Sequence, residues 1–217
     1  TPSTTPTSTP PLPTSTATAS ATATATATLP APASPTATAS ATPSHTATPS
    51  PTPVFDLRVN AGGPAYTDIG GALWQADRLY TAGQWGAIGG LTYSVANAIA
   101  NTDDDPIYQS ERWGMSGYAF DVPNGQYQVE LRFAEIYESS VNRRMFDVLI
   151  EGAPAIYHLD VFAAAGGKFR AYDRTFLVAV TDGQLNVAFA SVIGSAKVSA
   201  LRVTLLQPPT PTATSTP

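Results

Sequence analysis

The sequence contains no cysteine, which excludes a disulfide framework and any metal site built on thiolates. It also lacks an apolar run long enough to span a bilayer as a helix, so we expect no membrane insertion. Basic residues are few, with 11 Lys and Arg against 16 Asp and Glu and a formal net charge of −5. Because nucleic acids and anionic membranes attract clustered basic side chains, this balance argues against both as partners.

Residues 1–53 have no charged residue and no Phe, Tyr or Trp, and consist almost entirely of Thr, Pro, Ser and Ala. Residues 207–217 return to this composition. Such segments cannot bury enough apolar surface to offset the entropy lost on ordering. We therefore predict a disordered linker over 1–53, one folded domain over 54–206, and the start of a second linker over 207–217.

Thr/Pro-rich linkers are typical of secreted and cell-surface proteins. The chain also begins on Thr rather than Met, and we interpret it as part of a longer protein with covalently linked neighbouring domains. The expected localisation is therefore secreted or at the cell surface.

The folded segment carries a strong β-strand pattern. Apolar residues alternate with polar ones over 127–133, and shorter runs of the same kind occupy 146–150, 176–180, 185–189 and 201–205. Pro123-Asn-Gly125 and Asp182-Gly183 have the residues of hairpin turns. Many short strands joined by turns predict an all-β fold, an antiparallel β-sandwich of jelly-roll type. The Gly-rich segment 66–105 has weak periodicity, and we expect it to be irregular, with room for a helix near 69–80.

The residues give little support for catalysis. Glycoside hydrolysis needs two carboxylates facing one bond, and no spacing in this sequence selects such a pair. The domain has a single histidine and no serine in a nucleophile-elbow context. Three consecutive acids at 103–105 lack the spacing of a calcium loop and indicate a solvated turn. We therefore expect a protein that is not an enzyme and that has no cofactor and no metal.

Carbohydrate is a partner that the composition allows. Sugar sites combine aromatic platforms with polar groups that bind several hydroxyls. Tyr93, Tyr108 and Tyr137 lie near predicted loops, with polar residues close in sequence. The alternative for each tyrosine is packing against the core with its hydroxyl hydrogen-bonded, and composition does not separate the two.

A series of motifs in one order resembles the malectin domain over about residues 55–206. The motifs are Arg58-Val-Asn-Ala-Gly-Gly63, Ile107-Tyr-Gln-Ser-Glu-Arg-Trp113, Pro123-Asn-Gly-Gln-Tyr127, Leu131-Arg-Phe-Ala-Glu-Ile-Tyr137, Arg144-Met-Phe-Asp-Val148, Leu159-Asp160-Val and Ala196-Lys-Val-Ser-Ala-Leu201. The resemblance implies a galactose-binding-like jelly roll that binds oligosaccharide, including glucose-containing glycans, without catalysis. Bacterial members are treated as carbohydrate-binding modules, and the Thr/Pro-rich segments resemble that extracellular type.

The resemblance also implies site residues. Tyr108 and Tyr137 match tyrosines that contact sugar, and Tyr93 matches an earlier tyrosine of the site. Glu138 stands where animal members have Phe, and an Asp of those members has no counterpart near Gly194-Ser195. We predict that Glu138 replaces that carboxylate.

Glu111 and Arg112 belong to the same motif as Tyr108, and we expect them to fix its loop without contacting the sugar. Trp113 occupies a position where relatives have an aromatic residue, usually Tyr. The leading interpretation is a non-catalytic carbohydrate-binding module of a secreted or surface protein. The alternative is a structural or protein-interaction β-sandwich that has lost sugar binding. The sequence leaves open which sugar is bound, the oligomeric state and the neighbouring domains.

Overall fold

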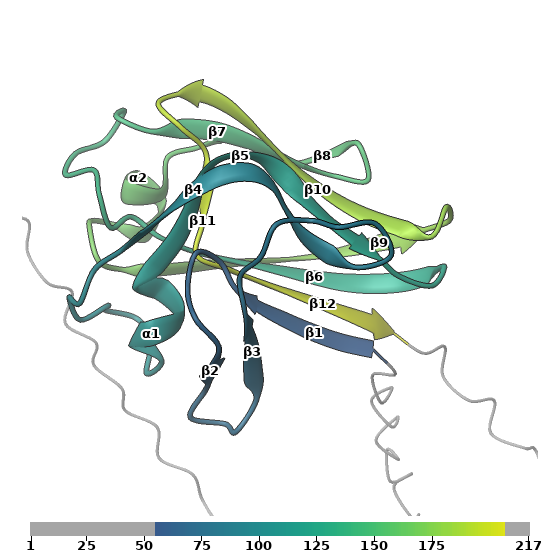
Figure 1. Cartoon of the computed structure of the whole chain (residues 1–217). Coiled ribbons are helices and arrows are strands. Elements are labelled where there is room, and N and C mark those ends of the chain that lie inside the picture. The colour runs from purple at the N-terminus through teal and green to yellow at the C-terminus, as the bar shows by residue number, and fades with distance from the viewer. Residues whose placement is uncertain (1–54, 207–217) are drawn as a thin grey trace, which may run out of the picture. The chain divides into compact units, whose positions relative to one another are not determined.

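The computed structural model describes residues 55–206, which form a sandwich of two β-sheets (Figure 1). One sheet has the strand order β2-β3-β1-β12-β6-β9, and the other has the order β11-β5-β10-β7-β8, with β4 also paired to β5. The elements are β1 (Phe55–Asn60), β2 (Tyr66–Thr67), β3 (Leu73–Ala76), β4 (Trp85–Ser94), α1 (Asp105–Tyr108), β5 (Ser110–Asp121), β6 (Gly125–Ala134), β7 (Met145–Ile150), β8 (Ala153–Leu159), α2 (Val161–Ala165), β9 (Ala171–Val180), β10 (Gln184–Ile193), β11 (Lys197–Val198) and β12 (Ala200–Leu206).

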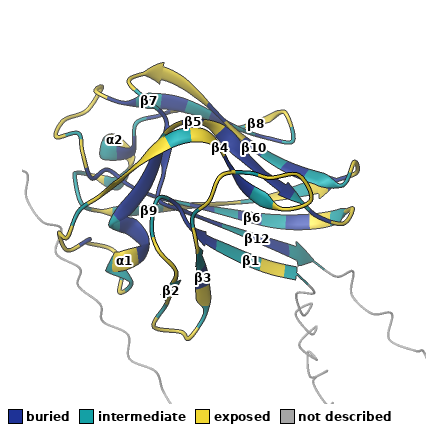
Figure 2. Ribbon diagram, in the orientation of Figure 1, coloured by how far each residue is buried: buried dark blue, intermediate teal, exposed yellow. Residues whose placement is uncertain are grey.

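The predicted antiparallel β-sandwich is confirmed. The alternating run 127–133 lies in β6, which pairs antiparallel with β12 on one side and β9 on the other. Its apolar residues are fully buried in the core between the sheets, while its polar residues are partly exposed, and Figure 2 colours the ribbon by this burial. The period of two therefore identified both the strand and its buried face.

Two expectations for the segment 66–105 were wrong. The region near 69–80 forms strand β3 instead of a helix, and the ten-residue strand β4 occupies 85–94. Gly86, Gly89 and Gly90 of β4 all have positive φ, so the strand is irregular and its side chains do not keep strict alternation. This irregularity hid the strand from a search for period two.

The main core fills the space between the sheets, with Tyr118, Phe120, Tyr127, Phe133 and Phe146 as its largest fully buried members. A second, smaller cluster closes one end of the sandwich. It consists of Trp74, Ile99, Ile107, Tyr108, Ala134, Ile136 and Ala200. This second cluster supports the start of β5 and the end of β6, where the candidate site lies.

Gly62, in the turn after β1, shows why the Ala-Gly-Gly motif needs glycine. Its φ is +72°, and an added Cβ would lie 2.1 Å from the carbonyl oxygen of Glu111. The backbone of this turn therefore packs directly on the backbone of β5, and only glycine fits the contact.

The predicted linkers lie outside the described residues, so the limits at 53 and 207 stay predictions. Within residues 55–206, no helix has the length and apolar character needed to cross a membrane.

Candidate functional site

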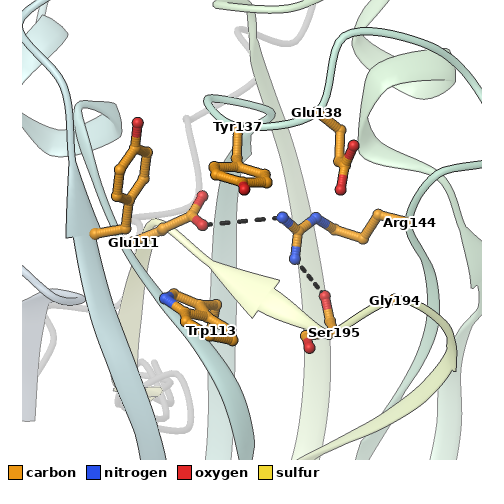
Figure 3. Close-up of a pocket in the computed structure, with 8 residues that line it drawn as sticks. Glu111, Trp113, Tyr137, Glu138, Arg144, Gly194 and Ser195 are labelled. Atoms are coloured by element: carbon orange, nitrogen blue, oxygen red, sulfur yellow. Dashed lines mark hydrogen bonds and ion pairs between the residues drawn. The ribbon is translucent and has the colours of Figure 1, made fainter.

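A pocket of about 300 Å³ opens where strands β4 and β5 meet the loop between β6 and β7 (Figure 3). Its size is at the lower end of the range for small-molecule sites. The residues that line it are Tyr93, Glu111, Trp113, Tyr137, Glu138, Arg144, Gly194 and Ser195.

Three aromatic side chains from three segments form the walls. Tyr93 comes from the end of β4, Trp113 from β5 and Tyr137 from the loop after β6. Tyr93 and Tyr137 pack edge to face, with ring centroids 5.6 Å apart and planes at 87°. Tyr137 is nevertheless 60% exposed, and Figure 3 shows Tyr137 and Trp113 on opposite sides of Glu111. Exposed aromatic surface therefore faces the pocket from more than one direction.

Buried charged side chains lie beneath the pocket, and two of them, Glu111 and Arg144, also line it. Lys197 is fully buried, pairs with the Glu111 carboxylate and donates to the carbonyl oxygen of Ala134. Arg144 Nε donates to Glu135 at 2.9 Å. Two carboxylates and two cations thus neutralise one another beneath the aromatic walls, as buried charges require.

Glu135 organises the loop that carries Tyr137. One of its carboxylate oxygens accepts hydrogen bonds from the backbone N–H groups of Tyr137 and Glu138, both at 2.9 Å. Burial alone would raise the pKa of Glu135, but Lys197, Arg144 and these N–H groups lower it below its ordinary value. The carboxylate therefore stays ionised at neutral pH and fixes the start of the loop.

Polar groups remain accessible at one end of the pocket. Arg144 Nη1 donates to the Ser195 carbonyl oxygen, whereas Nη2 lies 4.0 Å from Glu111, beyond hydrogen-bond length. The Glu138 carboxylate is 3.8 Å from Arg143 Nε, a loose ion pair at the surface. Arg144 Nη2 and the Glu138 carboxylate thus border the pocket, each with an ion-pair partner at 3.8–4.0 Å.

The structure brings Tyr93, Tyr137 and Glu138 together but not Tyr108. The Tyr108 side chain is 2% exposed, belongs to the second core cluster and donates its hydroxyl hydrogen to Asp173 at 2.8–2.9 Å. Burial and the Asp173 carboxylate both raise its pKa, so the hydroxyl stays protonated. A ring without an exposed face cannot stack on a sugar. Tyr108 therefore does not belong to the pocket. It packs against the core with its hydroxyl hydrogen-bonded, which was the alternative expected for each tyrosine.

Glu111 and Arg112 do not fix the Tyr108 loop as expected. Glu111 lines the pocket itself. The Arg112 side chain points the other way, with Nε 2.6 Å from Asp77 and Nη1 donating to the carbonyl oxygens of Gly89 and Gly90. Successive residues of a strand face opposite sides, so the two side chains have different neighbours. Arg112 ties β5 to the glycines of β4.

Sequence reasoning omitted Trp113, Arg144 and Ser195 from the site. The family resemblance gives Trp113 only as an aromatic position, although its spacing of two from Glu111 places both on one face of β5. Arg144 and the Gly194–Ser195 turn lie far from these residues in sequence, and only the fold brings them to the pocket.

The acidic run at 103–105 is occupied by local contacts. Asp104 accepts hydrogen bonds from the Tyr66 hydroxyl and the backbone N–H of Ile69, and Asp105 begins α1. No group of three or more His, Asp or Glu side chains within residues 55–206 is placed to hold a metal ion.

Comparison with known proteins identifies the family. A model of the malectin domain matches residues 55–203. The chain belongs to the malectin family. Human malectin is 30% identical over 132 residues, which cover 59% of this chain and 44% of the human protein. Malectin-B of Xenopus laevis is 29% identical over 132 residues, with 59% and 47% covered. The chain thus spans less than half the length of these malectins.

Solved structures share the malectin fold. A β-glucuronidase of Bacteroides uniformis superimposes with a TM-score of 0.67 at 28% identity, covering 70% of this chain and 18% of that chain. The ANXUR1 extracellular domain of Arabidopsis thaliana gives a TM-score of 0.61 at 20% identity, with 70% and 48% covered, and supports the fold alone.

Proposed function

We propose that this malectin domain is a non-catalytic carbohydrate-binding module, and that a sugar ring binds in the pocket between Trp113 and Tyr137. The observation that carries the proposal is the convergence of three partly exposed aromatic side chains on one small pocket. Sugar rings present apolar C–H faces, which pack on aromatic surfaces.

The polar end of the pocket suits hydroxyl groups. Glu138 accepts hydrogen bonds, and Arg144 Nη2 donates them. The charge of Arg144 is balanced together with those of Glu111, Glu135 and Lys197, and Arg143 lies 3.8 Å from Glu138, so the pocket favours a neutral sugar over a charged one. Glucose-containing glycans are the first class to test, because the family resemblance implies them.

The state of the carboxylates supports binding without catalysis. A glycosidase needs one carboxylic acid with a raised pKa. Glu135, beneath the pocket, has a lowered pKa and is ion-paired with Arg144. It is therefore held as a carboxylate and not as the acid that glycoside hydrolysis needs.

The setting of the domain supports a role in targeting. Among the matching structures, a β-glucuronidase chain contains a domain of this fold as 18% of its length. Together with the Thr/Pro-rich composition of residues 1–53 and 207–217, this favours a secreted or surface protein in which the module holds neighbouring domains near a glycan.

A glycan array followed by calorimetric titration tests the proposal. Trp113→Ala and Tyr137→Ala are each expected to weaken glycan binding about tenfold, because each removes one face of the sugar site. Tyr157→Ala is the control, since Tyr157 is an exposed tyrosine on β8, outside the pocket. Binding that survives both pocket variants would contradict the proposal. A folded protein that binds no glycan would favour the alternative, a protein-interaction module.

A further inference from the structure

An exposed leucine borders the pocket on β4. Leu91 is 61% exposed and lies directly opposite Trp113 in the antiparallel ladder of β4 and β5. Paired residues in such a ladder project their side chains to the same face, about 5 Å apart. Two residues further along β4, Tyr93 is paired with Glu111. The Leu91–Trp113 pair is therefore the next pair on the same face of the ladder after the Tyr93–Glu111 pair, which lines the pocket.

Two glycines, Gly89 and Gly114, lie next to the Leu91–Trp113 pair on β4 and β5. Gly89 pairs with Met115, and Gly114 follows Trp113. Their φ angles are +75° and +67°, and a Cβ added to either would meet no atom within 4 Å. Glycine within strands often marks a place where a ligand approaches the backbone closely. Beyond Leu91 the alternation breaks, because Met115 is buried in the core, and Gly89 and Gly114 leave uncovered backbone next to Leu91 and Trp113.

We infer that the sugar site extends along this ladder and binds a linear oligosaccharide, with one unit in the pocket and the following units over Leu91 and the glycines. This inference rests on the proposed function. The pocket alone is small for a ligand site, so most of a longer glycan must lie outside it. Leu91 extends the apolar surface of Trp113 along β4, on the side of Trp113 that lies toward Gly89.

Geometry and chemistry both favour further sugar units as the occupant of this surface. A single exposed leucine needs no explanation on a protein surface, but this one adjoins the aromatic wall of a pocket. The rise along a strand places Leu91 and Tyr93 about 7 Å apart, a spacing comparable to the length of one hexose unit. The leucine side chain can pack on the C–H face of the unit next to the one in the pocket.

Titration of the full chain with glucose, maltose and the maltose series up to maltohexaose tests the inference. The wild-type protein should bind maltohexaose about fivefold more tightly than maltose, because the longer chain covers Leu91. Leu91→Ser should reduce this ratio toward one. Leu177→Ser is the matched control, since Leu177 is an exposed leucine on β9 in the other sheet, and its ratio should equal that of the wild type.

The outcomes separate this inference from the proposed function. Equal affinity for maltose and maltohexaose, or an unchanged ratio in Leu91→Ser, would overturn the extended site while the pocket remains. Maltose binding that is unchanged in Trp113→Ala would also overturn the assignment of the pocket as the sugar site. Failure of the whole maltose series, with binding of another glycan on the array retained, would overturn the extended site alone, and failure to bind any glycan would overturn both.

Discussion

Replacing Lys197 by Met removes the ammonium group that neutralises Glu111 beneath the pocket. Both side chains are buried. The nearest remaining cation is Arg144, which lies 4.0 Å from Glu111 and is already hydrogen-bonded to Glu135. The replacement therefore leaves a buried carboxylate without a direct partner, which costs about 3–5 kcal/mol. In a domain of this size, that loss lowers Tm by roughly 10 °C.

Urea unfolding followed by tryptophan fluorescence measures the change, since the chain contains three tryptophans. The double variant Lys197→Met with Glu111→Leu should recover most of the lost stability, because it removes the unpaired charge along with its partner. Arg143→Ala is the surface control. Its ion pair with Glu138 is 3.8 Å long, and the Arg143 side chain is 67% exposed, so the loss of this pair should cost less than about 1 kcal/mol.

Two results would refute this reasoning. The first is a loss for Lys197→Met no larger than that for Arg143→Ala. The second is a double variant as unstable as the single one, since that would mean that the ammonium group stabilises the fold without neutralising Glu111.

Further predictions concern the backbone, Tyr108 and pH. Gly62→Ala should lower the free energy of unfolding by about 3 kcal/mol, since it combines positive φ with a backbone clash. Gly71→Ala, where φ is positive but the space is open, should cost only about 1 kcal/mol. Equal losses would contradict the close packing of the Gly62 turn on the backbone of β5. Tyr108→Phe should cost about 1 kcal/mol by removing the hydrogen bond to Asp173 and leave glycan affinity unchanged, and weakened binding would return Tyr108 to the site. The folded-state pKa of Glu135 is lowered, so its stabilising contribution is present above its unfolded pKa of about 4.3 and is lost as pH falls toward the folded value. Unfolding free energies between about pH 5 and pH 3 should therefore fall more steeply in the wild type than in Glu135→Gln, and parallel curves would contradict this.

The fold was predictable where the pattern of neighbouring residues alone determines the structure. The alternation over 127–133 identified β6, its buried face and the class of fold, because a period of two follows directly from strand geometry. Strand β4 was missed because its glycines adopt positive φ and break this period. The strand is defined instead by its pairing with β5, which a local pattern of apolar residues does not show.

The site was predictable only in part for the same reason. Tyr93, Tyr137 and Glu138 were selected from the sequence, and all three line the pocket. A motif alone does not show which of its aromatics faces outward. Tyr108, at the end of the four-residue helix α1, turns into the second core cluster, while Trp113 in β5 faces the pocket.

Chemical-shift mapping by NMR on the wild-type chain tests the central claim most directly, because it locates binding without altering the site. On titration with maltohexaose, the account predicts shifts of the Trp113 indole N–H and of the backbone amides of Tyr93, Tyr137 and Ser195, with no change at Tyr157. Shifts confined to residues outside the pocket, or none at saturating sugar, would contradict the assignment of a carbohydrate site to this pocket.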